Sequence, residues 1–200
     1  MDNRILGAAA LTTALILGVG ARSAAPPPNG PAFPDRPPLG HTGGFGEPTC
    51  ARCHAGDALN SIGGLLALEG LPSVYQTGVR YRLTVTLTRP RMLRSGFQLA
   101  IRFAGEDPPG RTAGTLRRID DRVQLADSLG VVYAFHTGVG SVLTAPGRAT
   151  WTLEWVAPND SGKTVVAHLA ANAANDDASE LGDYTYADSV VSQPRPVGGA

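Results

Sequence analysis

The residues with the most distinctive chemistry are Cys50, Cys53 and His54, in the stretch Cys-Ala-Arg-Cys-His. These are the only two cysteines among the 200 residues of the chain. The spacing Cys-x-x-Cys-His is that of a c-type haem attachment sequence. One short turn can present both sulfurs to the porphyrin edge, and His54 then becomes the proximal ligand of the iron. We therefore predict one covalently bound haem c.

Three other interpretations of the motif stay open. Cys50 and Cys53 could form a structural disulfide beside an incidental His54. They could form a redox dithiol, which requires a thioredoxin-like βαβ context. They could also belong to a zinc site, which would need a further ligand from the remaining histidines of the chain.

A low-spin haem iron needs a sixth ligand, and His136 is the predicted one. Met1 falls in the N-terminal apolar segment and Met92 in a turn, so both methionines are poor candidates. His136 ends a predicted strand, where a side chain can reach a haem at the edge of the domain. His41, in a glycine-rich segment before the motif, and His168, inside an apolar strand, are the alternatives.

The composition indicates a turn-rich β protein of one ordinary domain. Gly (25) and Pro (16) are abundant, and aromatic residues make up 6% of the chain. Seventeen basic residues balance 17 acidic ones, so the basic patch that nucleic-acid binding requires is not expected.

The chain divides into four predicted segments. Residues 1–25 have the basic start and apolar run of a signal peptide, or alternatively of an uncleaved N-terminal membrane anchor. Residues 26–40 form a Pro/Gly-rich linker, 41–192 the haem-bearing domain and 193–200 a flexible tail. An exported, periplasmic or otherwise extracytoplasmic location suits both covalent haem attachment and a disulfide.

Alternating apolar and polar residues predict the strands. The pattern is clearest over 81–87, 97–103 and 151–155, and shorter strands are expected at 115–119, 123–126, 131–137 and 184–191. Residues 163–171 are apolar on both faces, which is typical of a central strand. Residues 58–68 are interpreted as a loop or short helical turn. Seven or eight strands with turns between them favour a β-sandwich.

The chain resembles the bacterial reeler-like extracellular domains called choice-of-anchor proteins, and among them those that carry Cys-x-x-Cys-His. The resemblance rests on a set of short motifs that occur in the same order. The matching pieces are Thr-Gly-Gly-Phe-Gly-Glu-Pro-Thr at 42–49 with the motif that follows, Pro-Ser-Val-Tyr at 72–75, Gly-Phe-Gln-Leu at 96–99, Ala-Gly-Thr-Leu at 113–116, His136-Thr137, Trp-Thr-Leu-Glu-Trp-Val-Ala-Pro at 151–158, 170–175 and Gly182-Asp183. The resemblance implies an all-β, immunoglobulin-like antiparallel β-sandwich with an N-terminal haem-binding loop segment. Family members often end in a C-terminal anchoring tail, which 193–200 does not resemble, so attachment is expected through the N-terminus or a partner.

These features predict an exported monohaem c-type cytochrome domain, not an enzyme. It would transfer electrons in the periplasm, or serve as an accessory subunit of a membrane redox complex, with a redox protein as partner. The alternative is a non-redox adhesion or scaffold subunit with a Cys50–Cys53 disulfide. The acidic residues Asp176, Asp177, Glu180 and Asp183 do not have the spacing of an EF-hand and are interpreted as a solvent-exposed loop.

Overall fold

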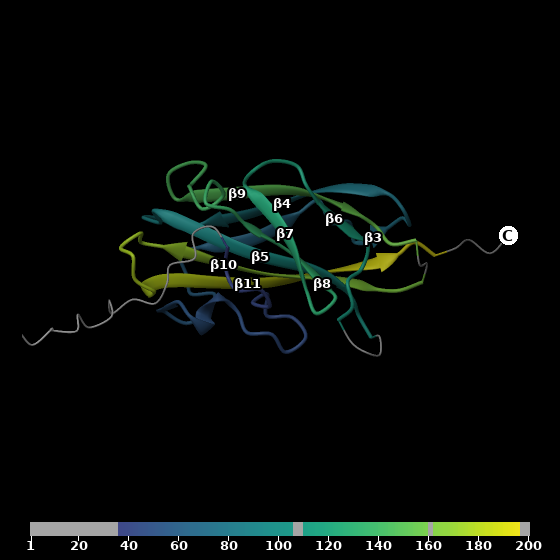
Figure 1. The fold of residues 1–200 in the computed structure, drawn as a ribbon, viewed down its shortest axis with the longest axis horizontal. Coiled ribbons are helices and arrows are strands. Elements are labelled where there is room, and N and C mark those ends of the chain that lie inside the picture. The colour runs from purple at the N-terminus through teal and green to yellow at the C-terminus, as the bar shows by residue number, and fades with distance from the viewer. Residues whose placement is uncertain (1–35, 106–109, 160–161, 197–200) are drawn as a thin grey trace, which may run out of the picture.

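The computed structural model describes residues 36–105, 110–159 and 162–196, which form a two-layer β-sandwich (Figure 1). The larger sheet has the strand order β1-β11-β10-β5-β8-β7, with β3 also paired to β11, and the smaller has the order β2-β4-β9-β6. The strands are β1 (Ala55–Gly56), β2 (Leu65–Glu69), β3 (Val74–Tyr75), β4 (Arg80–Thr88), β5 (Arg94–Phe103), β6 (Thr115–Arg118), β7 (Val123–Ser128), β8 (Val131–His136), β9 (Arg148–Val156), β10 (Val165–Ala174) and β11 (Leu181–Pro194). The helical element is one 3₁₀ turn, η1 (Cys50–Arg52).

The space between the sheets is filled by the inward-facing side of each strand. Leu83, Val85 and Leu87 of β4 face Phe97, Leu99 and Ile101 of β5, and all six belong to one buried cluster. Phe97 stacks on Trp151 with 4.6 Å between ring centroids, so aromatic packing ties the two layers together. The period-two alternation that predicts these strands is therefore the pattern of burial.

The predicted antiparallel β-sandwich is confirmed, and each predicted strand lies within or overlaps a strand of the structure. β10 is central, between β5 and β11, as its two apolar faces indicate. The interpretation of 58–68 as a loop or short helical turn was wrong in part, because residues 65–68 belong to β2. The run Leu-Leu-Ala-Leu-Glu has no strict alternation, and only its pairing with β4 makes it a strand. The short strands β1 and β3 pair parallel to β11, the exceptions to the antiparallel pattern in the described chain.

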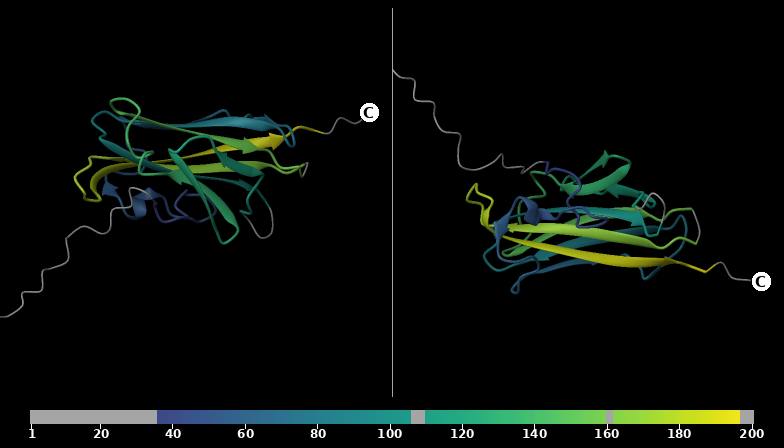
Figure 2. Two further views of the ribbon diagram at one scale, coloured as in Figure 1. Left: turned by 45° about the horizontal axis from the view of Figure 1, so that its top comes forward. Right: turned by 90° about the horizontal axis from the view of Figure 1, so that it is seen from below.

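Residues 36–54 lie on the outer face of the larger sheet, away from the smaller sheet (Figures 1 and 2). A buried polar cluster fastens this segment to the sheet. Arg102 of β5 donates to Glu47, and so does the Tyr133 hydroxyl of β8. Thr42 donates to the same carboxylate with an Oγ1–Oε2 distance of 2.6 Å. The cluster holds the loop that leads into Cys50 and Cys53.

The folded domain extends slightly beyond the predicted limits 41–192. Leu39 packs against a second apolar cluster on the outer face, beside Ala100, Tyr133 and Phe135. The carbonyl of Pro38 accepts a hydrogen bond from the buried side chain of Gln98. Strand β11 continues to Pro194. Within the described residues no helix is long and apolar enough to cross a membrane. The predicted targeting segment 1–25 and most of the predicted linker lie outside the described residues.

Candidate functional site

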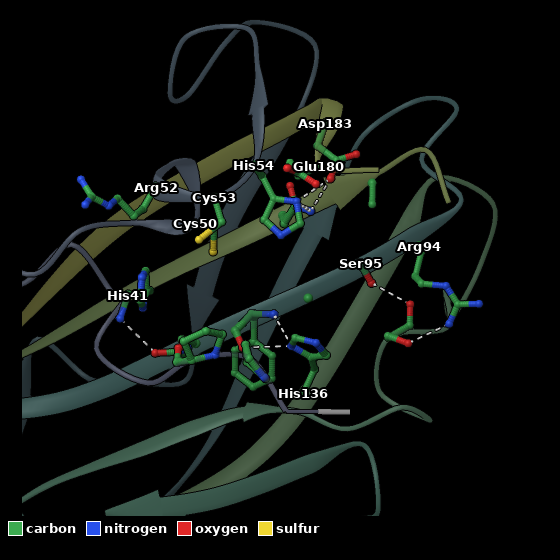
Figure 3. A pocket seen from close by; sticks show the side chains of 18 of the residues that line it. His41, Cys50, Arg52, Cys53, His54, Arg94, Ser95, His136, Glu180 and Asp183 are labelled. Atoms are coloured by element: carbon green, nitrogen blue, oxygen red, sulfur yellow. Dashed lines mark hydrogen bonds and ion pairs between the residues drawn. The ribbon is translucent and has the colours of Figure 1, made fainter. Parts of the chain in front are cut away.

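A single 3₁₀ turn presents the two cysteines. Thr49 caps η1 by accepting a hydrogen bond from the Ala51 amide at 3.3 Å. The Cys50 carbonyl accepts from the amides of Cys53 at 3.2 Å and His54 at 3.0 Å. Side chains three apart are eclipsed in a 3₁₀ turn, so the sulfurs of Cys50 and Cys53 lie on the same side. Figure 3 shows both sulfur atoms turned toward one cavity.

The cavity, of about 530 Å³, collects most of the residues that the sequence singled out. Cys50, Cys53, His54, His41 and His136 all line it, although His136 is far from the motif in the chain. Its walls come from η1, the residues before it, the start of β5, the end of β8, and the turn between β10 and β11. A volume of this size is in the range of small-molecule and cofactor sites.

His54 is oriented by a buried carboxylate. Its Nδ1 atom lies 2.6 Å from Oδ2 of Asp183, which is only 1% exposed. Because a carboxylate oxygen accepts, this short contact places a proton on Nδ1, and in the neutral ring Nε2 is then the nitrogen with a lone pair. Figure 3 shows the opposite edge of the ring facing the cavity.

Two further donors hold Asp183 in place. The side chain of Asn172 donates from Nδ2 to Asp183 Oδ2 at 2.9 Å, and the Asn175 amide donates to Oδ1 at 3.2 Å. Asn172 is itself 7% exposed, and its Oδ1 atom has no hydrogen-bond partner. Both oxygens of the Asp183 carboxylate therefore accept a hydrogen bond from a residue other than His54.

A glycine lets the motif approach this carboxylate. β1 pairs with β11 so that Gly56 lies opposite Asp183, and the Ala55 amide donates to the Glu180 carbonyl at 2.7 Å. A Cβ atom on Gly56 would lie 1.9 Å from the backbone oxygen of Asp183, which is a clash. The close backbone contact fixes the chain directly after His54 against the strand that carries Asp183.

His136 is 8% exposed and lies against the β5 backbone. The Phe97 amide donates to its Nδ1 at 3.1 Å, and the Phe97 carbonyl lies 3.3 Å from the same nitrogen. The two contacts require opposite tautomers, because the amide needs a lone pair on Nδ1 and the carbonyl needs a proton there. Only the carbonyl contact leaves Nε2 able to bind a metal.

The other two histidines are in different environments. His41 lines the cavity, and its Nδ1 lies 3.2 Å from the Leu39 carbonyl, which sets the tautomer with a lone pair on Nε2. His168 lies outside the cavity, under the loop, where Phe45 packs edge-on against its ring. Burial, together with the nearby Arg102 guanidinium, lowers the pKa of His168. His168 is thus a packing residue beneath the loop, while His41 shares the cavity with the motif.

The cysteines are free thiols in the structure. Cys50 is half-buried as a residue, and burial raises the pKa of its thiol to about 12. A protonated thiol is a poor nucleophile, which disfavours a reactive redox dithiol at this position. No βαβ unit occurs in the described residues. In the same part of the chain, no group of three or more His, Cys, Asp and Glu side chains is arranged to hold a metal ion.

The interpretation of the acidic residues as a solvent-exposed loop was wrong for one of them. Asp183 is buried under His54, and Asp176 pairs with Arg94 at 2.6 Å at the cavity rim. The functional partners of His54 that the motif did not reveal are thus Asp183 and Asn172. They lie 129 and 118 residues from His54 in sequence. The register of β10 with β11 brings Asn172 and Asp183 together, and the pairing of β1 with β11 brings His54 to them.

Comparisons with known proteins give only distant likenesses. No protein-family profile matches the chain, and no curated protein sequence does. Solved structures with a similar fold include the human F-spondin reeler domain, 23% identical over 69% of this chain and 95% of that one, with a TM-score of 0.44. A structure of the Reelin-N domain of F-spondin is 23% identical over 72% and 95%, with a TM-score of 0.43. A cohesin module from a Clostridium perfringens family 33 glycoside hydrolase is 12% identical over 67% and 98%, with a TM-score of 0.46.

Proposed function

We propose that this domain is a monohaem c-type cytochrome that transfers electrons outside the cytoplasm. The observation that carries the proposal is the convergence of Cys50, Cys53, His54 and His136 on one cavity. The motif supplies the first three of these residues. His136 comes from the end of β8, on the far side of β5 in the same sheet.

The residues around the cavity fit a covalently held haem. The two thiols share one side of a 3₁₀ turn, which suits attachment to two neighbouring vinyl groups. His54 offers Nε2 to the cavity because Nδ1 is occupied by Asp183. A Cβ atom on Gly96 would lie 2.6 Å from His136 Cε1, so the absence of a side chain there is what admits the imidazole.

Each residue has a separate task. Cys50 and Cys53 would form the thioethers, and His54 would bind the iron on the proximal side. His136 would approach as the sixth ligand, in the tautomer that donates from Nδ1 to the Phe97 carbonyl. Bound haem would supply a one-electron couple. The buried wall of β5 and β8 would limit the access of water and so influence the reduction potential.

The proposal implies a redox protein or a membrane redox complex as partner, reached after export through residues 1–25. It requires no substrate pocket, in agreement with a carrier or accessory subunit. The alternative adhesion or scaffold subunit would use the same outer face of the sandwich for docking, with the two sulfurs joined as a disulfide.

The test is covalent attachment in a host that carries the haem-maturation machinery. The purified protein is expected to keep its colour after acid-acetone extraction. Cys50→Ala or Cys53→Ala should weaken attachment, and the double variant should abolish it. Loss of all colour on extraction from the wild-type protein, with a disulfide between the two cysteines, would instead support the scaffold alternative.

A further inference from the structure

We propose that Asp183 is the positioning residue of the site. It holds His54 in the Nδ1–H tautomer and, with haem bound, makes His54 an electron-rich ligand that lowers the reduction potential. The effect on the reduction potential rests on the proposed function. The tautomer of His54 is a property of the polypeptide alone.

The contact has the features of a strong hydrogen bond. The 2.6 Å distance between His54 Nδ1 and Asp183 Oδ2 is short for a nitrogen–oxygen pair. Asp183 is 1% exposed, so water competes little for its oxygens, while the side chain of His54 is 37% exposed on the cavity side. One edge of the imidazole is therefore held in a dry environment and the other is open to a ligand.

The residues around His54 favour the orientation in which Nδ1 faces Asp183. Asn172 and the Asn175 amide hold the carboxylate in place, and Gly56 holds the chain after His54 against β11. Asn172 Nδ2 also lies 3.0 Å from His54 Nδ1. With the proton on Nδ1, both groups are donors that point toward the same Asp183 oxygen, so Asn172 stabilises the acceptor and does not compete with it.

The consequence for a bound metal follows from general coordination chemistry. A carboxylate that accepts the second ring N–H of a metal-bound histidine fixes its tautomer and raises its basicity. A more basic ligand favours the more highly charged, oxidised metal. Removal of the carboxylate charge should therefore raise the potential, whereas a purely structural role of Asp183 would change stability alone.

The first experiment uses the protein produced without haem. Long-range ¹H–¹⁵N spectra at about pH 8, above the ordinary histidine pKa of about 6.5, report the tautomer of each imidazole. Signals of His54 are assigned by their loss in His54→Gln. We expect His54 in the Nδ1–H form in the wild type and loss of that preference in Asp183→Asn. A wild-type His54 in the Nε2–H form would overturn the inference without any variant.

The second experiment uses the haem-loaded protein and measures the reduction potential by spectroelectrochemical titration. Asp183→Asn is expected to keep haem attached and to raise the potential. Asp176→Asn is the matched control, because it removes one carboxylate from the same cavity wall but from Arg94 and not from His54. A rise no larger than that of Asp176→Asn would overturn the inference, because charge alone would then explain it.

Failure of the proposed role of Asp183 can be distinguished from failure of the proposed function. If Asp183→Asn does not fold, Asn172→Ala leaves the carboxylate but removes one donor to the oxygen that contacts His54, and a shift of the potential is expected. An unchanged potential in Asn172→Ala would contradict the inference. If no haem attaches to the wild type, the proposed function fails, and the tautomer spectra still decide the role of Asp183.

Discussion

The imidazole of His136 lies directly against Gly96: a Cβ atom on Gly96 would be 2.6 Å from His136 Cε1 and 2.9 Å from Nδ1. Real Cβ atoms do not approach other atoms so closely, so any side chain at 96 must displace the ring. His136 comes from β8 and Gly96 from β5, and both residues line the cavity that Cys50 and Cys53 face (Figure 3).

Gly96→Ala is therefore expected to keep haem attached but to disturb the sixth ligand. The added methyl group forces His136 away from the Phe97 backbone and should lower the free energy of unfolding by about 1–3 kcal/mol, as overpacking does. Magnetic circular dichroism of the oxidised protein should show a high-spin fraction. Gly130→Ala, whose added Cβ would have no atom within 4 Å, is the control for the spectrum. Gly130 has a φ of +81°, unlike Gly96, so the backbone strain of this control affects its stability and not the iron ligands. An undisturbed low-spin spectrum in Gly96→Ala would contradict the placement of His136 at the iron.

Substitution of the histidines one at a time identifies the sixth ligand. His136→Ala should leave haem attached and convert a low-spin absorption spectrum to high-spin. His41→Ala is the informative control, because His41 lines the same cavity and its contact with the Leu39 carbonyl already leaves Nε2 as an acceptor. A native spectrum in His136→Ala together with a high-spin spectrum in His41→Ala would assign the ligand to His41. His168→Ala should leave the spectrum unchanged, because His168 lies outside the cavity.

The strands could be predicted from the sequence because burial on one side of each strand imposes alternation, as in residues 97–103. β2 could not, because its five residues are mostly apolar and become a strand only by pairing with β4. The cysteines and His54 could be predicted from local spacing, which one 3₁₀ turn satisfies. Asp183 could not, because its role depends on the register of β1 with β11.

Glu47 connects the loop before the motif to the sheet, and its removal should destabilise the protein. Its side chain is 15% exposed and that of Arg102 4%, so the pair is largely shielded from water. Glu47→Gln is expected to lower the free energy of unfolding by about 1.5–3 kcal/mol, the usual contribution of hydrogen bonds to a charged group. Glu154→Gln, which breaks a solvent-exposed contact with Arg80 at 3.6 Å, should cost less than about 1 kcal/mol. Equal losses in urea denaturation would show that the Glu47 cluster does not fasten the loop.

The same carboxylate predicts the acid sensitivity of the fold. Burial alone would raise the pKa of Glu47, but hydrogen bonds from Thr42, Tyr133 and Arg102, with the Arg102 charge, outweigh it and hold the pKa below its ordinary value of 4.5. A group with a lowered pKa in the folded state contributes stability above its unfolded pKa and loses it as the pH falls through the folded pKa. Urea denaturation of the wild type should therefore show a loss of stability below about pH 4.5 that is smaller in Glu47→Gln. Parallel curves for the two proteins would contradict the lowered pKa.

The residues just before the motif belong to the folded unit. A chain of residues 36–196 is expected to unfold cooperatively with nearly the stability of the full chain. A chain that begins at 41 should lose about 1 kcal/mol, because it removes the packing of Leu39 and the carbonyl that accepts from Gln98. Thermal denaturation of both proteins measures the difference. Equal melting temperatures would show that 36–40 contribute nothing to the fold.

The most direct test of the account is the visible absorption spectrum and intact mass of the wild-type protein produced with haem-maturation machinery. The protein is expected to show the sharp reduced bands of a c-type cytochrome and a mass increase of one haem that survives denaturation. A colourless protein with the mass of the polypeptide alone, its Cys50 and Cys53 free or bridged to each other, would contradict the proposal of a c-type cytochrome.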